Sequence, residues 1–221
     1  MAAGLFYVYT DPGTVDEAEF HDWYDHEHGP ARLTVPGLGP AYRYRALDEL
    51  KPTWLALYEL DRPDVIESPE YKALGAKASD RDKSVGAGLA TLDRRVYEQI
   101  SEDGSPVGRP APVILAVAMS VPEGSEDDLA AWYTEEHIPM LLKVPGWRRI
   151  RRFRLTRALD APGPGEPGVP AFLSVHELAG PEALEDPGFL AAISTPWRDR
   201  VVASALQRER RVFGLRNAIE A

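Results

Sequence analysis

The sequence contains no cysteine, and this absence excludes several kinds of site. Without cysteine there is no disulfide, no thiolate-bound metal or iron–sulfur cluster, and no cysteine nucleophile. The sequence also lacks any apolar run approaching the roughly 18 residues that a membrane-spanning helix needs. Its start, MAAGLFYVYTDPG, has neither the charged opening nor the long apolar stretch of a signal peptide. We therefore expect a cytoplasmic protein that does not span a membrane.

Basic residues are outnumbered by acidic ones, 25 against 35, which gives a net charge of −10. A chain this acidic repels nucleic acid and anionic membranes unless its basic residues cluster. The P-loop, G-x-S-x-G and H-E-x-x-H motifs are also absent. We expect a small-molecule partner, no nucleic acid or membrane partner, and no organic cofactor.

The most informative feature that is present is an internal repeat. Residues 23–37, WYDHEHGPARLTVPG, align with residues 132–146, WYTEEHIPMLLKVPG, at a constant offset of 109. Nine of these fifteen positions are identical, where chance gives about one. Each copy has about 100 residues, which is too long for a solenoid unit, so we interpret the copies as two homologous domains.

Two stretches rich in proline and glycine indicate how the copies are organised. Residues 102–112, EDGSPVGRPAP, predict a linker between one domain at 1–101 and another at 113–221. Residues 160–170, DAPGPGEPGVP, fall inside the second copy and shift the alignment offset from 109 to 118. We expect this second stretch to be a loop insertion rather than a domain boundary.

Each copy predicts the element order β-α-β-β-α-β, the ferredoxin-like unit. In the first helix, aromatic residues recur at helical spacing, and we expect Pro30 and Pro139 to end it. Capping-box spacing predicts that this helix begins after Thr14 or Ser125, and Ser68 followed by proline predicts the start of a second helix. The expected strands are 5–10, 41–47, 54–60 and 91–99, then 113–121, 148–156, 171–178 and 207–214.

The strand 54–60, WLALYEL, is largely apolar on both of its alternating faces. Both sides of its sheet must therefore be covered. Helices cover one face of a ferredoxin-like unit and leave the other bare, so we expect the two bare faces to bury each other.

An aromatic helix followed by H-x-P and V-P-G resembles the dimeric α+β barrel superfamily, and within it the EthD-like and methylmuconolactone isomerase-like proteins. The resemblance covers both copies, roughly residues 5–100 and 113–216. In that superfamily two ferredoxin-like units, usually from two chains, form a barrel with a ligand cavity between the sheets. The resemblance therefore implies an α+β fold in which tandem units form an intramolecular barrel, as a monomer or a homodimer.

The histidines of the repeat are the first catalytic candidates. His28 and His137 continue the aromatic stripe of each first helix, where a polar side chain is either buried with a partner or faces a cavity. Histidine exchanges protons near neutral pH, and the resemblance places the H-x-P histidine at the active site. The alternative is that both histidines cap the helix and serve the fold. His28 shares a helix face with His21 and Asp25, but the second copy keeps only the histidine, so we expect no metal site.

His176 is a third candidate because the two copies differ at this position. It aligns with Tyr58 and shares a strand face with Ser174. If that face lines the barrel, the second copy supplies the roomier half of the cavity and His176 carries the proton; the alternative is a buried structural histidine. The other residues expected to line the cavity and bind substrate are Tyr7, Tyr9, Trp54, Tyr58 and Ser174.

Arginine is concentrated in one predicted strand, near residues 148–157. Arg152 and Arg154 share a face, and an inward-facing arginine can hold a carboxylate or an enolate. We take both as substrate-binding candidates, and the alternative for most of the run is a set of solvated ion pairs.

Together these features predict a cofactor-free enzyme that uses general acid–base catalysis on an aromatic or polyketide-like substrate, of the isomerase, cyclase or decarboxylase type. Two alternatives stay open. One is a non-catalytic ligand-binding or stress-response protein of the same fold, and the other is a haem-handling enzyme with a histidine as axial ligand. The resemblance does not decide among them, because this fold carries many chemistries.

Overall fold

The computed structural model describes residues 4–106, 110–160 and 168–220. The chain divides into two units. Unit 1 comprises residues 1–99, 156–161 and 215–221, and unit 2 comprises residues 100–155 and 162–214. Each unit therefore contains most of one sequence copy together with short segments from the other.

The strand order is β4-β1-β3-β2 in unit 1 and β8-β5-β7-β6 in unit 2, and these pairings are antiparallel. This order and the helices between the strands confirm the predicted α+β class and the tandem ferredoxin-like units. In the described residues the strands are β1 (Gly4–Asp11), β2 (Leu38–Ala46), β3 (Trp54–Leu60), β4 (Thr91–Gly104), β5 (Val113–Ser120), β6 (Trp147–Ala158), β7 (Phe172–Leu178) and β8 (Gln207–Ile219).

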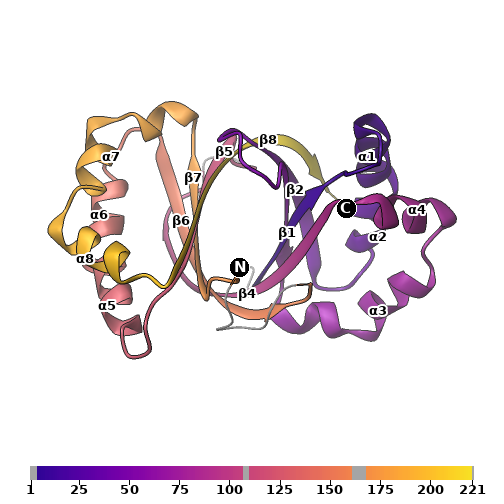
Figure 1. Ribbon diagram of the computed structural model, residues 1–221, viewed down its shortest axis with the longest axis horizontal. Coiled ribbons are helices and arrows are strands. Elements are labelled where there is room, and N and C mark those ends of the chain that lie inside the picture. The colour runs from indigo at the N-terminus through magenta and orange to yellow at the C-terminus, as the bar shows by residue number, and fades with distance from the viewer. Residues whose placement is uncertain (1–3, 107–109, 161–167, 221) are drawn as a thin grey trace. The chain divides into compact units, whose positions relative to one another are not determined.

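In unit 1 the helices lie on one face of the strands (Figure 1). Phe6 and Val8 of β1 and Trp54 and Tyr58 of β3 point to that face, where they pack against Phe20 in a buried cluster. Burying an apolar side chain of this size contributes about 1.5–3 kcal/mol. The helices are α1 (Glu17–Trp23), α2 (Gly29–Leu33), α3 (Pro69–Ala76) and α4 (Asp80–Gly88), with a 3-10 turn at Pro63–Glu67.

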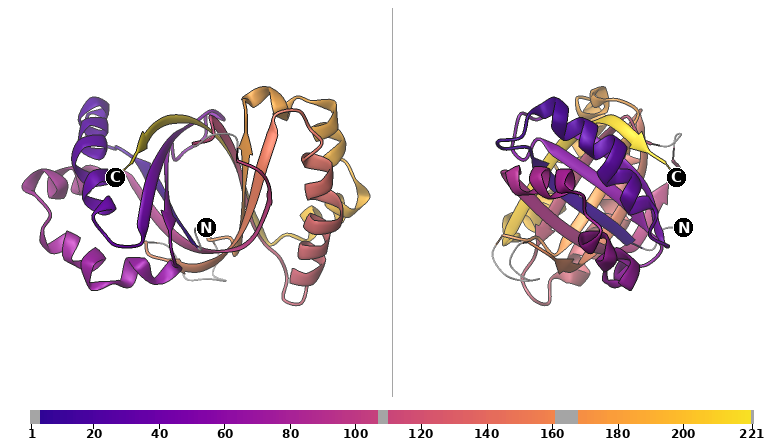
Figure 2. Two further views of the ribbon diagram at one scale, coloured as in Figure 1. Left: turned by 180° about the vertical axis from the view of Figure 1, so that it is seen from behind. Right: turned by 90° about the vertical axis from the view of Figure 1, so that its right-hand side faces the viewer.

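Unit 2 repeats this arrangement, and Figure 2 shows its helices along one side of its strands. Leu115, Trp132, Trp147 and Phe189 belong to the buried cluster between the strands and helices of this unit. The helices are α5 (Glu126–Ala131), α6 (Ile138–Leu141), α7 (Pro187–Ala192) and α8 (Pro196–Ser204), with a 3-10 turn at Pro181–Leu184. The predictions missed α4 and α8, which are short and weakly amphipathic.

The expectation that proline ends each first helix is wrong. A π-helical turn, η1 (Tyr24–His28), follows α1 directly, and the chain continues through Pro30 into α2. The amide of Gly29 donates to the carbonyl of Tyr24, five residues earlier. The wider turn allows the helix to pass a residue that has no amide hydrogen. Unit 2 has the same kind of π-helical turn, η3 (Trp132–His137), ahead of Pro139.

Two predicted helix caps also differ from the structure. Asp16, rather than Thr14, caps α1 by accepting from the amides of Ala18 and Glu19. Ser125 precedes α5, but its side chain makes no capping hydrogen bond. Ser68 caps α3 as predicted, accepting from the backbone amide of Tyr71.

Strand β4 is longer than expected and continues through Gly104. The first residues of the linker predicted at 102–112 are therefore strand, and residues 107–109 lie outside the described part of the chain. Most of the loop predicted at 160–170 also lies outside it. In the described residues, no helix is long and apolar enough to cross a membrane.

Candidate active site

Unit 1 encloses a cavity of about 170 Å³ between its strands and its helices. For comparison, a cavity of about 150 Å³ holds a benzene molecule. Its walls combine aromatic and aliphatic surface with a small group of polar side chains, which is typical of ligand sites. Those side chains include Tyr24, His28, Arg32, Tyr58, Tyr71, Asp82 and Arg94.

A histidine–carboxylate pair is the main polar feature of this cavity. Nδ1 of His28, the last residue of η1, lies 3.0 Å from Oδ1 of Asp82 on α4. The indole Nε1 of Trp23 donates to the same oxygen at 3.0 Å. Asp82 is held in place because Ser79 caps α4 and accepts from the Asp82 amide at 2.9 Å. A carboxylate beside Nδ1 favours the Nδ1–H tautomer and leaves Nε2 as the basic nitrogen.

Burial lowers the pKa of His28 to about 4, although its hydrogen bond to Asp82 acts in the opposite direction. The hydrogen bond from His28 in turn lowers the pKa of Asp82. At neutral pH the pair is therefore a neutral imidazole beside a carboxylate, and the imidazole can accept a proton. The His28 ring also packs against the rings of Trp23 and Tyr24, with centroids 4.2 and 5.0 Å away.

Two buried tyrosines lie in the same wall. The hydroxyl oxygens of Tyr24 and Tyr58 are 2.8 Å apart. One hydroxyl donates to the other, so the pair keeps one hydroxyl hydrogen for a further acceptor. Burial raises the pKa of both residues, and that of Tyr58 lies well above its ordinary value. Both therefore remain neutral, and the site combines a base with a neutral hydrogen-bond donor.

The glutamate before each repeated histidine has a structural role. Glu27 accepts a hydrogen bond from the hydroxyl of Ser79, the residue that caps α4. In unit 2, Glu136 accepts from the hydroxyl of Thr195, the cap of α8, at 2.6 Å. In both units this bond ties the first helix to the last one.

The side chains of His21 and Asp25 contact the buried Arg43 and form no cluster with His28. Arg43 forms an ion pair with Asp25, and its Nη2 lies 3.0 Å from Nδ1 of His21. Arg216 also donates to Asp25, at 2.7 Å. Burial and, to a lesser extent, the charge of Arg43 lower the pKa of His21 to about 4. The described residues contain no group of three histidines or carboxylates placed to hold a metal ion.

The strand register divides residues that were expected on one cavity wall. Phe6 pairs with Tyr58, whereas Tyr7 pairs with Leu57. Residues paired directly across a sheet point to the same face. Tyr58 therefore lies under the helices, and Tyr7 and Tyr9 point to the opposite face, where their hydroxyls are 2.6 Å apart. The expectation that Tyr7, Tyr9 and Tyr58 line the same wall of a cavity is therefore wrong.

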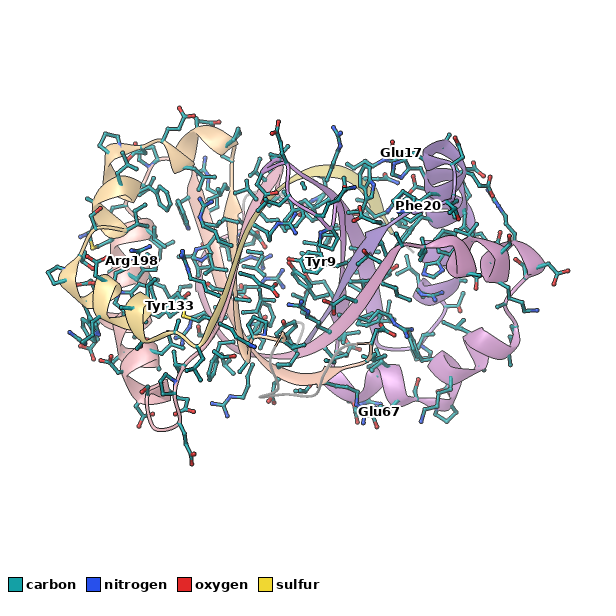
Figure 3. The ribbon with its side chains drawn as sticks, viewed as in Figure 1. Tyr9, Glu17, Phe20, Glu67, Tyr133 and Arg198 are labelled. Carbon is teal, nitrogen blue, oxygen red and sulfur yellow. The ribbon has the colours of Figure 1, made fainter. Side chains whose placement is uncertain are left out.

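The remaining aromatic candidate of unit 1, Trp54, lies on the helix-covered face with Tyr58. Its ring centroid is 4.4 Å from that of His21, near the end of the strand. Figure 3 shows the division directly, because Tyr9 and Phe20 lie on opposite sides of the unit 1 strands.

Because paired residues point to the same face, the strand register also shows that the expected position of His176 is wrong. It pairs with Leu115, so it lies under the helices of unit 2. Nε2 of His176 is 2.9 Å from the hydroxyl oxygen of Ser174, and its ring centroid is 5.4 Å from that of Trp147. Burial lowers its pKa well below the ordinary value. The catalytic role expected of His176 depended on a side chain on the other face of the sheet, away from the helices.

Unit 2 also has the smaller cavity, contrary to expectation. It measures about 40 Å³, against about 170 Å³ in unit 1. Trp147 stands where the first copy has Leu38, and its indole stacks on Phe189 at a centroid distance of 5.2 Å.

His137 is the counterpart of His28 but makes different contacts. Its ring stacks on that of Trp132, with centroids 4.3 Å apart. Burial lowers its pKa to about 4, against the opposing effect of the Ala192 backbone. No hydrogen-bond partner for its Nδ1 occurs in the described part of the chain.

The arginine-rich strand β6 is more buried than the solvated alternative implied. Arg152 lies 4.3 Å above the centre of the Tyr133 ring, and Arg154 is exposed above Phe172. On the other face, Arg149 forms a buried ion pair with Glu177. Neither Arg152 nor Arg154 is among the described residues that line the 40 Å³ cavity.

The sequence reasoning missed Asp82, Tyr24, Tyr71 and Arg94 as cavity residues. Asp82 had a detectable signal, because it follows Ser79 at the S-x-x-D spacing of a capped helix. Its counterpart in the second copy is Arg198, three residues after the cap Thr195, and this reversal of charge in a duplicated sequence was the second clue.

Comparison with known proteins supports the fold. No family model matches the chain, and no curated protein sequence matches it. Among solved structures, an anthrone oxidase-like protein is 16% identical, with coverage of 99% of this chain and 94% of that one and a TM-score of 0.67. A Fusobacterium nucleatum protein provisionally described as a monooxygenase is 7% identical, with coverage of 99% and 95% and a TM-score of 0.62.

A third solved structure is a ferredoxin-fold protein from Listeria monocytogenes, described as related to antibiotic biosynthesis monooxygenases. It is 8% identical, with coverage of 98% of this chain and 96% of that one and a TM-score of 0.53. These likenesses support an α+β fold of the ferredoxin-like kind, in line with the fold that the resemblance of the H-x-P and V-P-G motifs implied. The finer resemblance to EthD-like proteins stays a prediction.

Proposed function

We propose that unit 1 is the catalytic half of a small-molecule enzyme and that His28 is its general base. The observation that carries this proposal is the His28–Asp82 pair at a cavity of about 170 Å³. That volume fits one ring of an aromatic or polyketide-like substrate. The non-catalytic alternative offers no reason for a carboxylate-oriented imidazole in the wall of a cavity.

The reaction class that fits this site begins with removal of a proton from a carbon next to a carbonyl group. Nε2 of His28 takes the proton, and the electron pair of the C–H bond becomes an enolate on the carbonyl oxygen. The free hydroxyl hydrogen of the Tyr24–Tyr58 pair donates to that oxygen and stabilises its charge. Return of the proton to a different carbon completes an isomerisation and regenerates neutral His28.

A second candidate is oxidation of the same enolate by dioxygen, which the names of the structural neighbours favour. In that reaction a methylene group becomes a carbonyl. One atom of dioxygen remains in the product, and the other leaves as water with the two methylene hydrogens. Both candidates share the first step, so His28 has the same role in each.

The haem-handling alternative has less support. A cavity of about 170 Å³ is smaller than the roughly 300–1,000 Å³ of pockets that enclose drug-sized ligands, and a haem exceeds most such ligands in size.

The test uses an aromatic lactone with an acidic methylene group as the probe. Hydrogen–deuterium exchange at the methylene, followed by NMR in D2O without oxygen, measures proton removal, and oxygen uptake measures the oxidation. His28→Gln is expected to lower the enzyme-dependent exchange by roughly 10²–10⁴-fold. Asp82→Asn is expected to lower it by roughly 10–100-fold, because the neutral amide that replaces the carboxylate no longer fixes the tautomer of His28.

The matched control is His26→Gln, because His26 is exposed and, among the described residues, its side chain bonds only its helix neighbour Asp22. Unchanged exchange in His28→Gln would contradict the assignment of the base. Binding of the probe without any exchange would favour the non-catalytic alternative.

A further inference from the structure

The two units differ at one charged position beneath their helices. Asp82 is the third residue of α4, and its amide donates to the cap residue Ser79. Arg198 holds the same position in α8, and its amide donates to the cap residue Thr195 at 3.1 Å. The duplicated scaffold therefore presents a carboxylate in unit 1 and a guanidinium in unit 2.

This replacement removes an acceptor that two side chains use in unit 1. Asp82 accepts from Nε1 of Trp23 and from Nδ1 of His28, both at 3.0 Å. Their counterparts are retained in unit 2, where Trp132 is 2% exposed and His137 is 8% exposed. Nε1 of Trp132 and Nδ1 of His137 are both buried without a hydrogen-bond partner in the described part of the chain.

Two more unpartnered nitrogens line the same cavity of about 40 Å³. They are Nε1 of Trp147 and Nδ1 of His176, and both side chains are at least nine-tenths buried. Leaving such groups unpaired is costly. Indole nitrogens only donate, so Trp132 and Trp147 require an acceptor.

The charge around this cavity is positive. Its lining includes Arg198, Arg208 and Arg210 and, within the described chain, no aspartate or glutamate. Burial, with Arg198 and Arg210, lowers the pKa of Arg208. The one ion-pair partner of Arg198 in the described residues is its neighbour Asp199, which is 64% exposed, and such a pair is weak. Figure 3 shows Arg198 and Tyr133 on the helix side of the unit 2 strands.

We propose that unit 2 binds a small monovalent oxyanion of the size of formate or nitrate in the place that the Asp82 carboxylate occupies in unit 1. Nε1 of Trp132 donates to one of its oxygens, and Arg198 supplies the opposite charge. A volume of about 40 Å³ admits an ion of this size but not the ring that fits unit 1. The duplication has thus produced one cavity with its own carboxylate and one that takes its anion from solution.

The experiment titrates the full chain with sodium formate and, separately, with sodium nitrate at constant ionic strength. The indole N–H signals are followed by NMR in protein labelled with ¹⁵N-tryptophan, and Trp132→Phe assigns the Trp132 signal. We expect a saturable shift of that signal together with a rise in melting temperature. Saturation by both ions indicates a general oxyanion site, and saturation by formate alone indicates a carboxylate site.

The decisive variant is Arg198→Asp, which gives unit 2 the carboxylate found in unit 1. It is expected to abolish the response of Trp132 to both ions and to raise the melting temperature in their absence, because the new carboxylate accepts from Nε1 of Trp132. The matched control is Arg200→Asp, which makes the same charge change two residues along α8 at a side chain that is 62% exposed. This control is expected to keep the shift.

Two results would overturn the proposal. One is a Trp132 signal that moves with neither ion. The other is a saturable shift that Arg198→Asp leaves intact in a protein that is folded by its NMR spectrum. Loss of the shift in Arg200→Asp as well would also count against it, because a general effect of charge would then account for the response.

Discussion

At the scale of single residues, burial keeps four of the histidines neutral. His21, His28 and His137 have pKa values lowered to about 4 by burial, and burial lowers the pKa of His176 well below its ordinary value. Each ring fills space between aromatic side chains or beside an arginine, where a positive charge is costly. For His28 the same burial keeps the imidazole available as a base at neutral pH.

These lowered pKa values predict that the free energy of unfolding falls with acidification. An exposed histidine in the unfolded chain binds a proton below about pH 6.5, whereas these four stay neutral in the folded protein down to about pH 4 or below. Stability is therefore fully present above about pH 6.5 and is lost toward pH 4, by up to about 1.4 kcal/mol per pH unit for each histidine.

Urea denaturation at a series of pH values measures this slope. His137→Phe is expected to reduce it, because phenylalanine keeps the ring stacked on Trp132 without a titrating group. His26→Gln is expected to leave it unchanged, because His26 is exposed. A stability that stays flat from pH 7 to pH 4 would contradict the burial of neutral histidines.

At the scale of elements, the π-helical turn is what brings the repeated histidine to the cavity. The turn widens the helix ahead of Pro30, so the chain continues into α2. Gly29 is required at this point because a Cβ there would lie 2.4 Å from Cδ1 of Ile219 and 2.9 Å from the carbonyl oxygen of Tyr24. The π-helical turn therefore depends on the close contact between Gly29 and Ile219, which the helix propensities of its residues do not predict.

Gly29→Ala is expected to destabilise the protein by about 1–3 kcal/mol, since the added methyl group overpacks this contact. Thermal unfolding measures the effect. The control is Gly75→Ala in α3, where a Cβ meets nothing within 4 Å, and this change is expected to stabilise by about 0.4–1 kcal/mol. An unchanged melting temperature in Gly29→Ala would show that the helix can move away from Ile219 at no cost.

At the scale of the whole molecule, each unit is completed by segments of the other sequence copy. Unit 1 includes residues 156–161 and 215–221. Within it, Arg94 pairs with Asp160 through two hydrogen bonds of 2.6 Å, and Thr156 donates to the carbonyl of Val96 at 3.0 Å. The ends of β6 and β8 are thus part of the fold of unit 1.

A fragment of residues 1–106 is therefore expected to remain unfolded or to self-associate, because it lacks these segments and leaves apolar surface bare. Dispersion of its NMR spectrum and light scattering measure the outcome. Co-expression with a fragment of residues 107–221 is expected to restore a folded protein. A monomeric, folded 1–106 fragment would contradict the interdependence of the two copies.

The sequence alone determined the duplication and the ferredoxin-like element order, because these follow from local periodicity and from motifs repeated at a constant offset. It also singled out His28, which lines the cavity of unit 1, and its catalytic role stays a prediction. It did not decide which face of each strand the helices cover. Tyr9 and Tyr58 alternate with apolar residues on strands that are buried on both sides, so composition is the same on either face and only the register separates them. The tertiary structure alone brought Asp82 to His28 across 54 residues of chain, because that contact depends on the packing of α4 against the first helix.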